Sequence, residues 1–237
     1  MKRPDDSDLE YLARMIHDLR SPANTILGYI GNLEDGVRGE MTPEQLADLA
    51  SMRRVTNRLV AMLEQELHHI TIERGALRLS PADIPLSLAV AELQCTAGPQ
   101  LQAKDIAFDR STCRTSACQV TVRADHLALM RILTNLLDNA IKFTPAGGRI
   151  TVSCGAHAEA GRATVRVCDT GPGIPASEIE NIFEPYVQLE AAVQGAHGGV
   201  GLGLANSRDL ARAMNGELRA ESTPGAGAVF VLTLPLA

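Results

Sequence analysis

The sequence lacks tryptophan and has few other aromatic residues, which make up 3% of its 237 residues. It also lacks the cysteine spacing of a metal site or a redox motif. None of the five forms a C-x-x-C pair, and their number is odd: Cys95, Cys113, Cys118, Cys154 and Cys168. This usage disfavours a disulfide framework or a zinc site and favours reduced thiols, from which we expect a cytoplasmic location.

Long apolar runs and an excess of positive charge are missing too. No stretch approaches the roughly 18 apolar residues that cross a bilayer, and Met1 to Asp6 lead into no apolar signal segment. We therefore expect no membrane segment in this chain. The formal net charge of -6 disfavours a nucleic-acid partner. A G-x-x-x-x-G-K-[ST] motif and an H-R-D motif are both absent, which excludes a P-loop site and a eukaryotic-type protein kinase.

The sequence does have enough apolar residues for a folded core, because 45% of them are hydrophobic. Its length fits one or two domains. The hydrophobic period changes near residue 75, so we expect a helical hairpin over residues 1–75 and an α/β domain over residues 76–237. The predicted fold class is α+β.

The first domain is predicted to contain two long helices. One apolar seam, with alternating spacings of three and four, predicts a helix over about residues 8–34. The glycine-containing turn 35–40 follows. Thr42-Pro43-Glu44-Gln45 then supplies a capping threonine, a proline at the first helical position and a glutamine at the third. The second helix continues to about residue 74. Its apolar stripe is too wide for one partner helix, which favours a homodimer in which two hairpins form a four-helix bundle.

The stretch His17-Asp18-Leu19-Arg20-Ser21-Pro22 stands inside the first helix. His17 follows a seam position, so it lies at the margin of the apolar face, where water can reach it. If the Asp18 carboxylate accepts the Nδ1 proton, Nε2 is left as a nucleophile. Ser21 lies one turn further along the same face, and Pro22 predicts a kink. Taken alone, the stretch favours a surface histidine on an amphipathic helix with a kinking proline, because short motifs often match by chance.

The second domain is predicted to alternate between strands and helices. We expect strands at 77–79, 106–108, 120–122, 150–154, 163–168, 217–221 and 228–234. We expect helices from about 86 to 97 with an interruption at Gly98-Pro99, from a cap at Asp125 to Lys142, within 176–185, and from the Gly198–Leu204 stretch to Met214.

Three side chains of the helix after Asp125 are candidates for binding a phosphate group with magnesium. Asn135, Asn139 and Lys142 are spaced by four and three, so they project from one face. Amide oxygens suit a hard cation, and the ammonium suits phosphate. The alternative is an exposed polar helix face without a ligand.

Two glycine-rich stretches are further candidates. Asp169-Thr170-Gly171-Pro172-Gly173 follows a predicted strand, where a carboxylate can accept a hydrogen bond from an adenine amino group and glycines let the backbone approach the base. The same residues also fit a plain turn. Gly199, Gly201 and Gly203 open the later helix, and backbone N–H groups at a helix start suit an anion.

In this order, these stretches resemble the motifs of the sensor histidine kinases of two-component signalling. His17–Pro22 resembles the H box, Asn135–Lys142 the N box, Asp169–Gly173 the first glycine box, Phe183-Glu184-Pro185 the F box, and Gly199–Gly203 the second glycine box. The match covers nearly the whole chain. It implies a dimerisation and phosphotransfer hairpin, followed by an ATP-binding α/β sandwich of the GHKL type with helices on one face of a mixed sheet.

The resemblance also implies a reaction. ATP would phosphorylate His17 on Nε2 with Asp18 as the general base. The phosphoryl group would then pass to an aspartate in the receiver domain of a response regulator. Ser21 stands where the family usually has Thr or Asn, a position associated with orienting water for dephosphorylation of that partner, and a hydroxyl can hold a water. Asp18 replaces the commoner Glu and reaches one methylene less far.

The resemblance implies binding roles for the second domain. Asn139 would ligate Mg²⁺, and Asn135 and Lys142 would face the phosphates. Asp169 would bind the adenine amino group, with Phe143 near the base. The matching glycines of the two boxes would approach the nucleotide: Gly171, Gly173, Gly199, Gly201 and Gly203. Residues 186–200 would form a lid over ATP. Two alternatives remain open, a non-kinase ATPase of the same superfamily and a non-catalytic dimeric scaffold.

Overall fold

The chain divides into two compact units, Met1–Leu77 and Arg78–Ala237. The computed structural model describes residues 6–37, 39–73, 79–110, 113, 120–188 and 201–237. Within that part of the chain, none of the helices combines the length and the apolarity that a membrane span requires.

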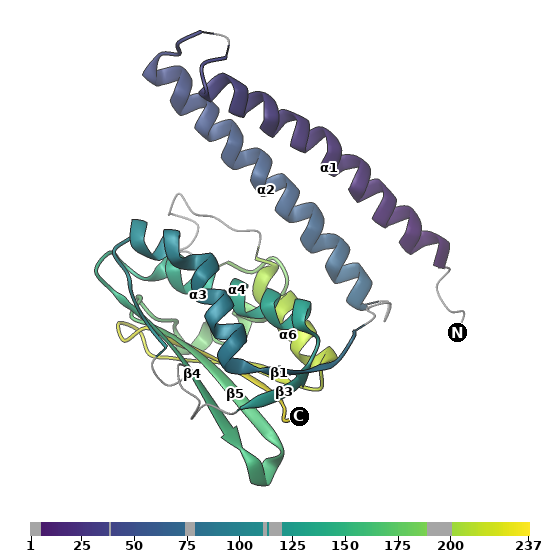
Figure 1. Cartoon of the computed structure of the whole chain (residues 1–237), viewed down its shortest axis with the longest axis vertical. Helices are drawn as coiled ribbons and strands as arrows, with labels where there is room; N and C mark the ends of the chain where they lie inside the picture. The colour runs from purple at the N-terminus through teal and green to yellow at the C-terminus, as the bar shows by residue number, and fades with distance from the viewer. Residues whose placement is uncertain (1–5, 38, 74–78, 111–112, 114–119, 189–200) are drawn as a thin grey trace. The chain divides into compact units, whose positions relative to one another are not determined.

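The first unit is a hairpin of two long helices, drawn in purple and slate blue in Figure 1. Helix α1 spans Asp6–Glu34 and includes Pro22, and helix α2 spans Pro43–Glu73. The predicted capping box is confirmed, because the Gln45 N–H donates to Thr42 Oγ1 over 3.3 Å and the Thr42 N–H donates to Gln45 Oε1 over 2.8 Å. At the other side of the turn, Arg53 on α2 binds Glu34 on α1.

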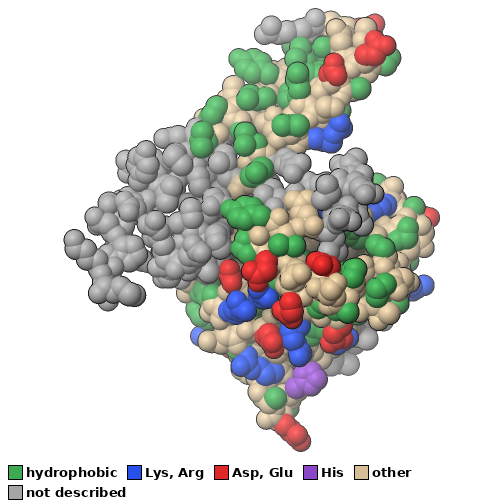
Figure 2. Space-filling view, turned by 180° about the vertical axis from the view of Figure 1, so that it is seen from behind, with side chains coloured by type: hydrophobic (Ala, Val, Ile, Leu, Met, Phe, Trp, Pro, Cys, Tyr) green, Lys and Arg blue, Asp and Glu red, His purple; other side chains and the backbone are tan. Residues whose placement is uncertain are grey.

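Among its described side chains, the hairpin buries few apolar ones within one copy of the chain. Ala23, Ile30 and Leu49 are buried between the helices. Among the described residues of the hairpin, nine larger apolar side chains remain exposed: Leu19, Ile26, Tyr29, Val37, Leu46, Met52, Val55, Leu59 and Met62. Hydrophobic side chains are accordingly frequent on the hairpin surface in Figure 2. A single hairpin therefore leaves much of its apolar stripe in water.

The second unit is built on a five-stranded mixed sheet. Its strands are β2 (Ala107–Asp109), β4 (Arg149–His157), β5 (Arg162–Asp169), β7 (Ala228–Pro235) and β6 (Glu217–Ser222), in that spatial order. The β2–β4 pair is parallel and the other pairs are antiparallel. A separate two-stranded sheet pairs β1 (Ala82–Pro85) with β3 (Thr121–Ala124).

Three helices lie on one face of the larger sheet (Figure 1): α3 (Leu86–Ala103), α4 (His126–Phe143) and α6 (Gly203–Ala213). Two short 3-10 turns, η3 (Ala176–Glu178) and η4 (Asn181–Phe183), stand in place of the expected helix within 176–185. The predicted fold class is confirmed: a helical hairpin precedes a mixed sheet that carries helices on one face.

The strand register shows which sheet residues form the core. Val165 on β5 lies opposite Leu232 on β7 and Cys154 on β4, and both Val165 and Leu232 are buried. Alternate residues point to the other face, where Arg166 on β5 binds Glu221 on β6 at 3.0 Å. Leu133, Leu136 and Leu137 on α4 complete the core between helices and sheet.

The helix interruption predicted at Gly98-Pro99 is wrong. Helix α3 does not stop at Gly98-Pro99 but continues through both residues to Ala103. Pro99 removes only one backbone hydrogen bond, whereas Ala97 and Leu101, buried on either side of it, keep the helix packed against the domain. Of the strand predicted at 77–79, residues 77 and 78 lie outside the described residues, and the first described strand of the domain is Ala82–Pro85.

Candidate functional site

Helix α4 is fixed at both ends, and it carries most of the predicted ligand-binding side chains. The Asp125 carboxylate caps its start, accepting hydrogen bonds of 2.9 Å from the Ala128 and Ser80 N–H groups. Although partial burial opposes it, this hydrogen bonding lowers the pKa of Asp125. At the other end, Lys104 Nζ donates to the carbonyl oxygens of Ile141 at 2.6 Å and Lys142 at 2.8 Å. Lys104 thus binds the negative end of the helix dipole, a role that the sequence did not reveal.

Asn135 joins α4 to the start of α6. Its Nδ2 donates to Ser207 Oγ over 2.9 Å. Gly203, the first residue of α6, lies so close that a Cβ atom there would overlap Asn135 Oδ1. Glycine is therefore needed for the N-terminus of α6 to approach this asparagine. The structure thus brings together two of the predicted site residues, Asn135 and Gly203.

Asn139 and Lys142 lie one and two turns further along α4. Asn139 is half-buried, and its amide has no hydrogen-bond partner among the described residues. Lys142 Nζ lies 4.8 Å from the centre of the Phe143 ring, which is partly exposed at the end of the helix. From Asn135 to Phe143 the helix rises by about 12 Å, so these side chains line an extended path.

Asp169 ends strand β5 on the helix-covered face, opposite Ile150. One carboxylate oxygen, Oδ1, accepts hydrogen bonds from the Gly171 N–H at 2.8 Å and the Ala228 N–H at 3.3 Å. The other oxygen, Oδ2, has no hydrogen-bond partner within the described part of the chain and can still accept from a ligand. Burial raises the pKa of the Asp169 carboxyl, and the two N–H groups oppose this rise.

The first glycine stretch connects Asp169 to the end of α4. A Cβ atom at Gly171 would lie 2.8 Å from Asp169 Oδ1 and 3.0 Å from the Phe143 carbonyl oxygen. Gly173 adopts a φ of 75° and lies against the Thr223 carbonyl, so its contact is with the turn between β6 and β7. Gly227, which the sequence analysis missed, lies so close to the Asp169 carbonyl that no side chain fits there.

The second glycine stretch is described only from Gly201 onward, and Gly199 lies outside the described residues, as does most of the expected lid. Gly201 has a φ of 80° and accepts a hydrogen bond of 3.0 Å from the Tyr186 N–H. A Cβ atom at Gly201 would lie 2.7 Å from the Val187 carbonyl oxygen. Residues 186 and 201 are therefore joined directly at the backbone.

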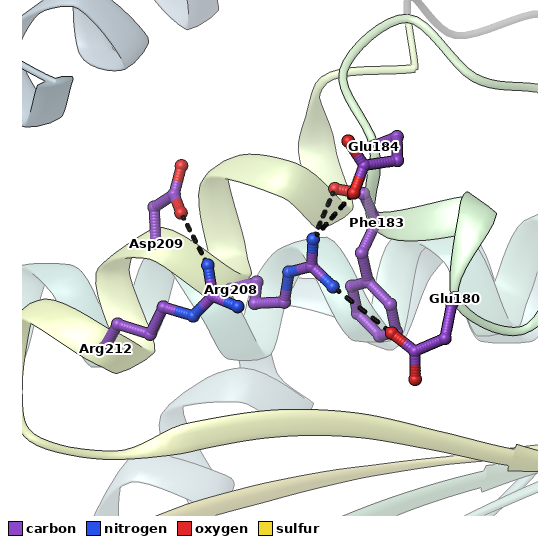
Figure 3. A network of polar contacts seen from close by, with 6 residues as sticks. All are labelled: Glu180, Phe183, Glu184, Arg208, Asp209 and Arg212. Carbon is purple, nitrogen blue, oxygen red and sulfur yellow. Dashed lines mark hydrogen bonds and ion pairs between the residues drawn. The ribbon is translucent and has the colours of Figure 1, made fainter.

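Arg208 on α6 holds the F-box turn in place, as Figure 3 shows. Its guanidinium lies 5.0 Å from the centre of the Phe183 ring and donates to Glu184 Oε1 at 3.2 Å. A second nitrogen, Nη1, is 3.5 Å from Glu180 Oε2. Phe183 also packs edge-on against Phe230 in the core, with the ring centres 6.5 Å apart. Sequence reasoning named the F box but not this arginine.

The H-box stretch lies within α1 of the first unit. The Ser21 side chain is exposed, and the Ser21 carbonyl accepts a 3.0 Å hydrogen bond from Thr25 Oγ1. The side chains of His17 and Asp18 lie outside the described residues. Their predicted roles therefore stay predictions.

The donors around α4 fit magnesium held together with phosphate rather than a closed metal cage. Magnesium prefers oxygen ligands and keeps several waters while sharing substrate phosphates. Asn139 offers one amide oxygen, Lys142 offers positive charge, and Gly203 brings the N-terminus of α6, where backbone N–H groups suit an anion, close to Asn135. No group of three or more His, Cys, Asp or Glu residues is placed to hold a metal within the described residues.

Comparison with known proteins identifies the family to which the second unit is similar. Residues 124–237 match the family described as "Histidine kinase-, DNA gyrase B-, and HSP90-like ATPase". A solved structure described as "Crystal structure of ShkA full-length in complex with AMPPNP" is similar over 96% of this chain and 46% of that one, with a TM-score of 0.76 and 30% identity. The structure of the Acinetobacter baumannii histidine kinase AdeS shares the fold over 93% of this chain and 98% of its own, with a TM-score of 0.63 and 21% identity.

Curated relatives extend the match to the first unit. The "Autoinducer 2 sensor kinase/phosphatase LuxQ" of Vibrio vulnificus is 32% identical, over 96% of this chain and 26% of LuxQ. The "Sensor histidine kinase GacS" of Pseudomonas protegens is 31% identical, over 96% of this chain and 24% of GacS. The chain thus spans about a quarter of the length of these relatives. It belongs to the sensor histidine kinases, and the predicted family is confirmed.

Proposed function

We propose that this chain is the catalytic core of an ATP-dependent protein histidine kinase that phosphorylates its own His17. The observation that carries the proposal is the arrangement around α4: Asn135 contacts the first turn of α6, and Asp169 presents one carboxylate oxygen with no partner among the described residues. These features suit a nucleoside triphosphate. Asp169 can accept from the adenine amino group, and the polar side chains of α4 lead toward the N-terminus of α6. Phe143, at the end of α4, would lie near the base.

In the proposed reaction, His17 Nε2 attacks the γ-phosphorus of ATP, and the bond to the bridging oxygen breaks, so that ADP leaves with the electron pair. Asp18 accepts the Nδ1 proton of His17 and orients the ring. Asn135 and Lys142 hold the phosphates, with the positive charge of Lys142 offsetting the charge that develops. Magnesium, held by Asn139 and the phosphates, would supply charge neutralisation at the transferred group.

Incubation of the purified chain with γ-labelled ATP and magnesium tests the proposal. We expect a phosphoprotein that is labile to acid and stable to alkali, because the bond formed is P–N. The His17→Gln variant should carry no label while binding ATP normally. Label that survives in this variant, or none in the wild type, would contradict the proposal. ATP hydrolysis without a phosphoprotein would favour the non-kinase ATPase instead.

We further propose that the phosphoryl group passes to an aspartate of a response regulator, and that Ser21 assists its later hydrolysis. Ser21 is exposed one turn beyond His17 on α1, where its hydroxyl can hold a water. LuxQ carries the name kinase/phosphatase, which supports a second activity here. Loss of regulator dephosphorylation in Ser21→Ala, with His17 labelling unchanged, is the expected result. Equal rates of regulator dephosphorylation in Ser21→Ala and in wild type would contradict the proposed role of Ser21.

The proposed active form is a homodimer in which two hairpins pack as a four-helix bundle. The support is the row of exposed apolar side chains on the hairpin, including Met52 at 57% and Val55 at 67% exposure. Sedimentation should give twice the chain mass. Val55→Glu, which places a charge in that row, should shift the protein toward the monomer, whereas a dimer unaffected by the change would place the interface elsewhere.

A further inference from the structure

Two cysteine side chains meet at one edge of the larger sheet, away from the residues assigned to nucleotide binding. Cys113 Sγ lies 2.7 Å from Cys154 Sγ. It also lies 3.6 Å from the Val152 carbonyl oxygen. Cys113 is fully buried and Cys154 is partly exposed. One sulfur of the pair is thus shielded, while the other is within reach of small solutes.

The short edge strand explains why these residues meet. Strand β2 pairs with β4 only as far as Thr151, so beyond that point the outer side of β4 has no strand partner within the described part of the chain. Cys113 follows soon after the end of β2, and its N–H donates a 2.8 Å hydrogen bond to the Arg110 carbonyl. The Cys113 sulfur lies beside the outer backbone of β4 at Val152.

The strand register separates this pair from the candidate nucleotide site. Cys154 lies opposite Val165 on β5, whereas Ile150 lies opposite Asp169. Four residues along a strand correspond to about 13 Å. A covalent change at Cys154 therefore leaves Asp169 and its hydrogen bonds in place.

We propose that Cys113 and Cys154 are a redox modification site, which a peroxide converts to a reversible disulfide. The Cys154 sulfur attacks one peroxide oxygen, the O–O bond breaks and water leaves, giving a sulfenic acid. The Cys113 sulfur then attacks the Cys154 sulfur, the S–O bond breaks and a second water leaves. Two thiols are oxidised by two electrons and the peroxide is reduced. Closing the bond needs the sulfur atoms to approach by roughly 0.7 Å, from 2.7 Å to a bond length near 2.05 Å.

The chain offers two internal controls. Cys95 is exposed on α3, and it has no cysteine partner among the described residues. Cys168 lies on β5 opposite Thr151, on the sheet face away from the helices. Burial raises the pKa of the Cys168 thiol, which lowers its reactivity. Neither control cysteine should form a disulfide within the monomer.

The test exposes the whole purified chain to hydrogen peroxide, blocks remaining thiols by alkylation, and maps peptides by mass spectrometry without reduction. We expect the chain to lose two hydrogen atoms, a peptide pair joining Cys113 to Cys154, and full reversal by dithiothreitol. Cys118→Ser should retain the disulfide, and Cys113→Ser should instead accumulate a trappable sulfenic acid at Cys154. ATP affinity should be equal before and after oxidation.

A second measurement does not depend on any variant folding. Because a bridge between residues 113 and 154 restrains the unfolded chain, oxidised wild type should melt on the order of 5 °C or more above the reduced protein. Cys113 and Cys154 that both alkylate fully after peroxide would overturn the proposal. So would a disulfide that involves Cys118 or a second copy of the chain.

Discussion

At the scale of single residues, the burial of the Asp169 carboxylate is a cost to the fold. Its carboxylate is half-buried at the end of β5, and burial raises its pKa despite two N–H donors. Between the ordinary value near 4 and this raised value, the native state binds more protons than the unfolded state does. The free energy of unfolding therefore falls as pH rises through that interval. Above that pH interval, the ionised Asp169 carboxylate lowers the free energy of unfolding of the nucleotide-free protein.

The Asp169→Asn variant separates this cost from the function. An asparagine can still accept the Gly171 N–H bond, but it carries no charge, so we expect a higher melting temperature than wild type at pH 7 to 8 without nucleotide. The advantage should shrink as pH falls toward about 4, where wild type becomes protonated. ATP affinity should fall by about tenfold or more, since an acceptor is replaced by a donor. Melting curves across pH and titration calorimetry measure both effects, and an unchanged ATP affinity would contradict the adenine role.

Gly203 gives a second prediction at this scale. A Cβ atom there overlaps Asn135 Oδ1, so Gly203→Ala must displace Asn135 or the start of α6. We expect a loss of about 1–3 kcal/mol in the free energy of unfolding, together with weaker ATP binding. The matched control is Gly28→Ala on α1, where nothing lies within 4 Å of the added atom. That change should stabilise by up to about 1 kcal/mol and leave ATP binding unaltered. Denaturant titration distinguishes the two variants.

At the scale of elements, the packing of α6 against the F-box turn depends on Arg208. Arg208→Ala loses the stacking on Phe183 and the contacts with Glu180 and Glu184, which should cost about 1–2 kcal/mol in the free energy of unfolding. Arg208→Lys keeps the charge but not the planar stacking and should recover only part of the loss. Arg212→Ala, four residues along the same helix, removes one exposed pair with Asp209 and should cost almost nothing. Equal losses for Arg208→Ala and Arg212→Ala would show that the network does not hold the turn.

The helices also show how far local sequence determines an element. The start of α2 was predictable because the side chains of Thr42 and Gln45 each accept a hydrogen bond from the other residue's backbone N–H, within a span of four residues. The end of α3 was not, because Gly98-Pro99 is a local stop signal that the burial of Leu101 overrides. Helix boundaries followed the sequence where the deciding contact was local, and departed from it where the contact was tertiary.

The candidate site shows the same difference between local and tertiary contacts. Asn135, Asn139 and Lys142 share one helix, so their spacing was visible in the sequence. The partners that position the site come from far along the chain: Ser207 lies 72 residues from Asn135, and Ala228 lies 59 residues from Asp169. No spacing rule connects such pairs. The sequence therefore indicated the candidate ligand-binding groups and missed the residues that position them.

At the scale of the whole molecule, we expect the two units to be separable in function. Residues 78–237 contain the candidate nucleotide site, and residues 1–77 contain His17. The isolated fragment 78–237 should bind ATP with the affinity of the full chain and remain unlabelled by γ-labelled ATP. Adding fragment 1–77 in excess should restore labelling on that fragment, at a rate reduced by the loss of tethering. Labelling of the isolated fragment 78–237 would show that it contains a phosphate acceptor and would contradict the assignment of the acceptor to His17.

Strand β6 borders the larger sheet and alternates apolar residues, packed under the helices, with charged ones: Glu217, Arg219 and Glu221. An open strand edge is a template on which another chain can add a strand. The charges at every second position oppose such growth, because an incoming strand would have to dehydrate them. These three exposed side chains thus guard the edge without being part of the core, and we expect their replacement with valine or threonine to favour fibril formation.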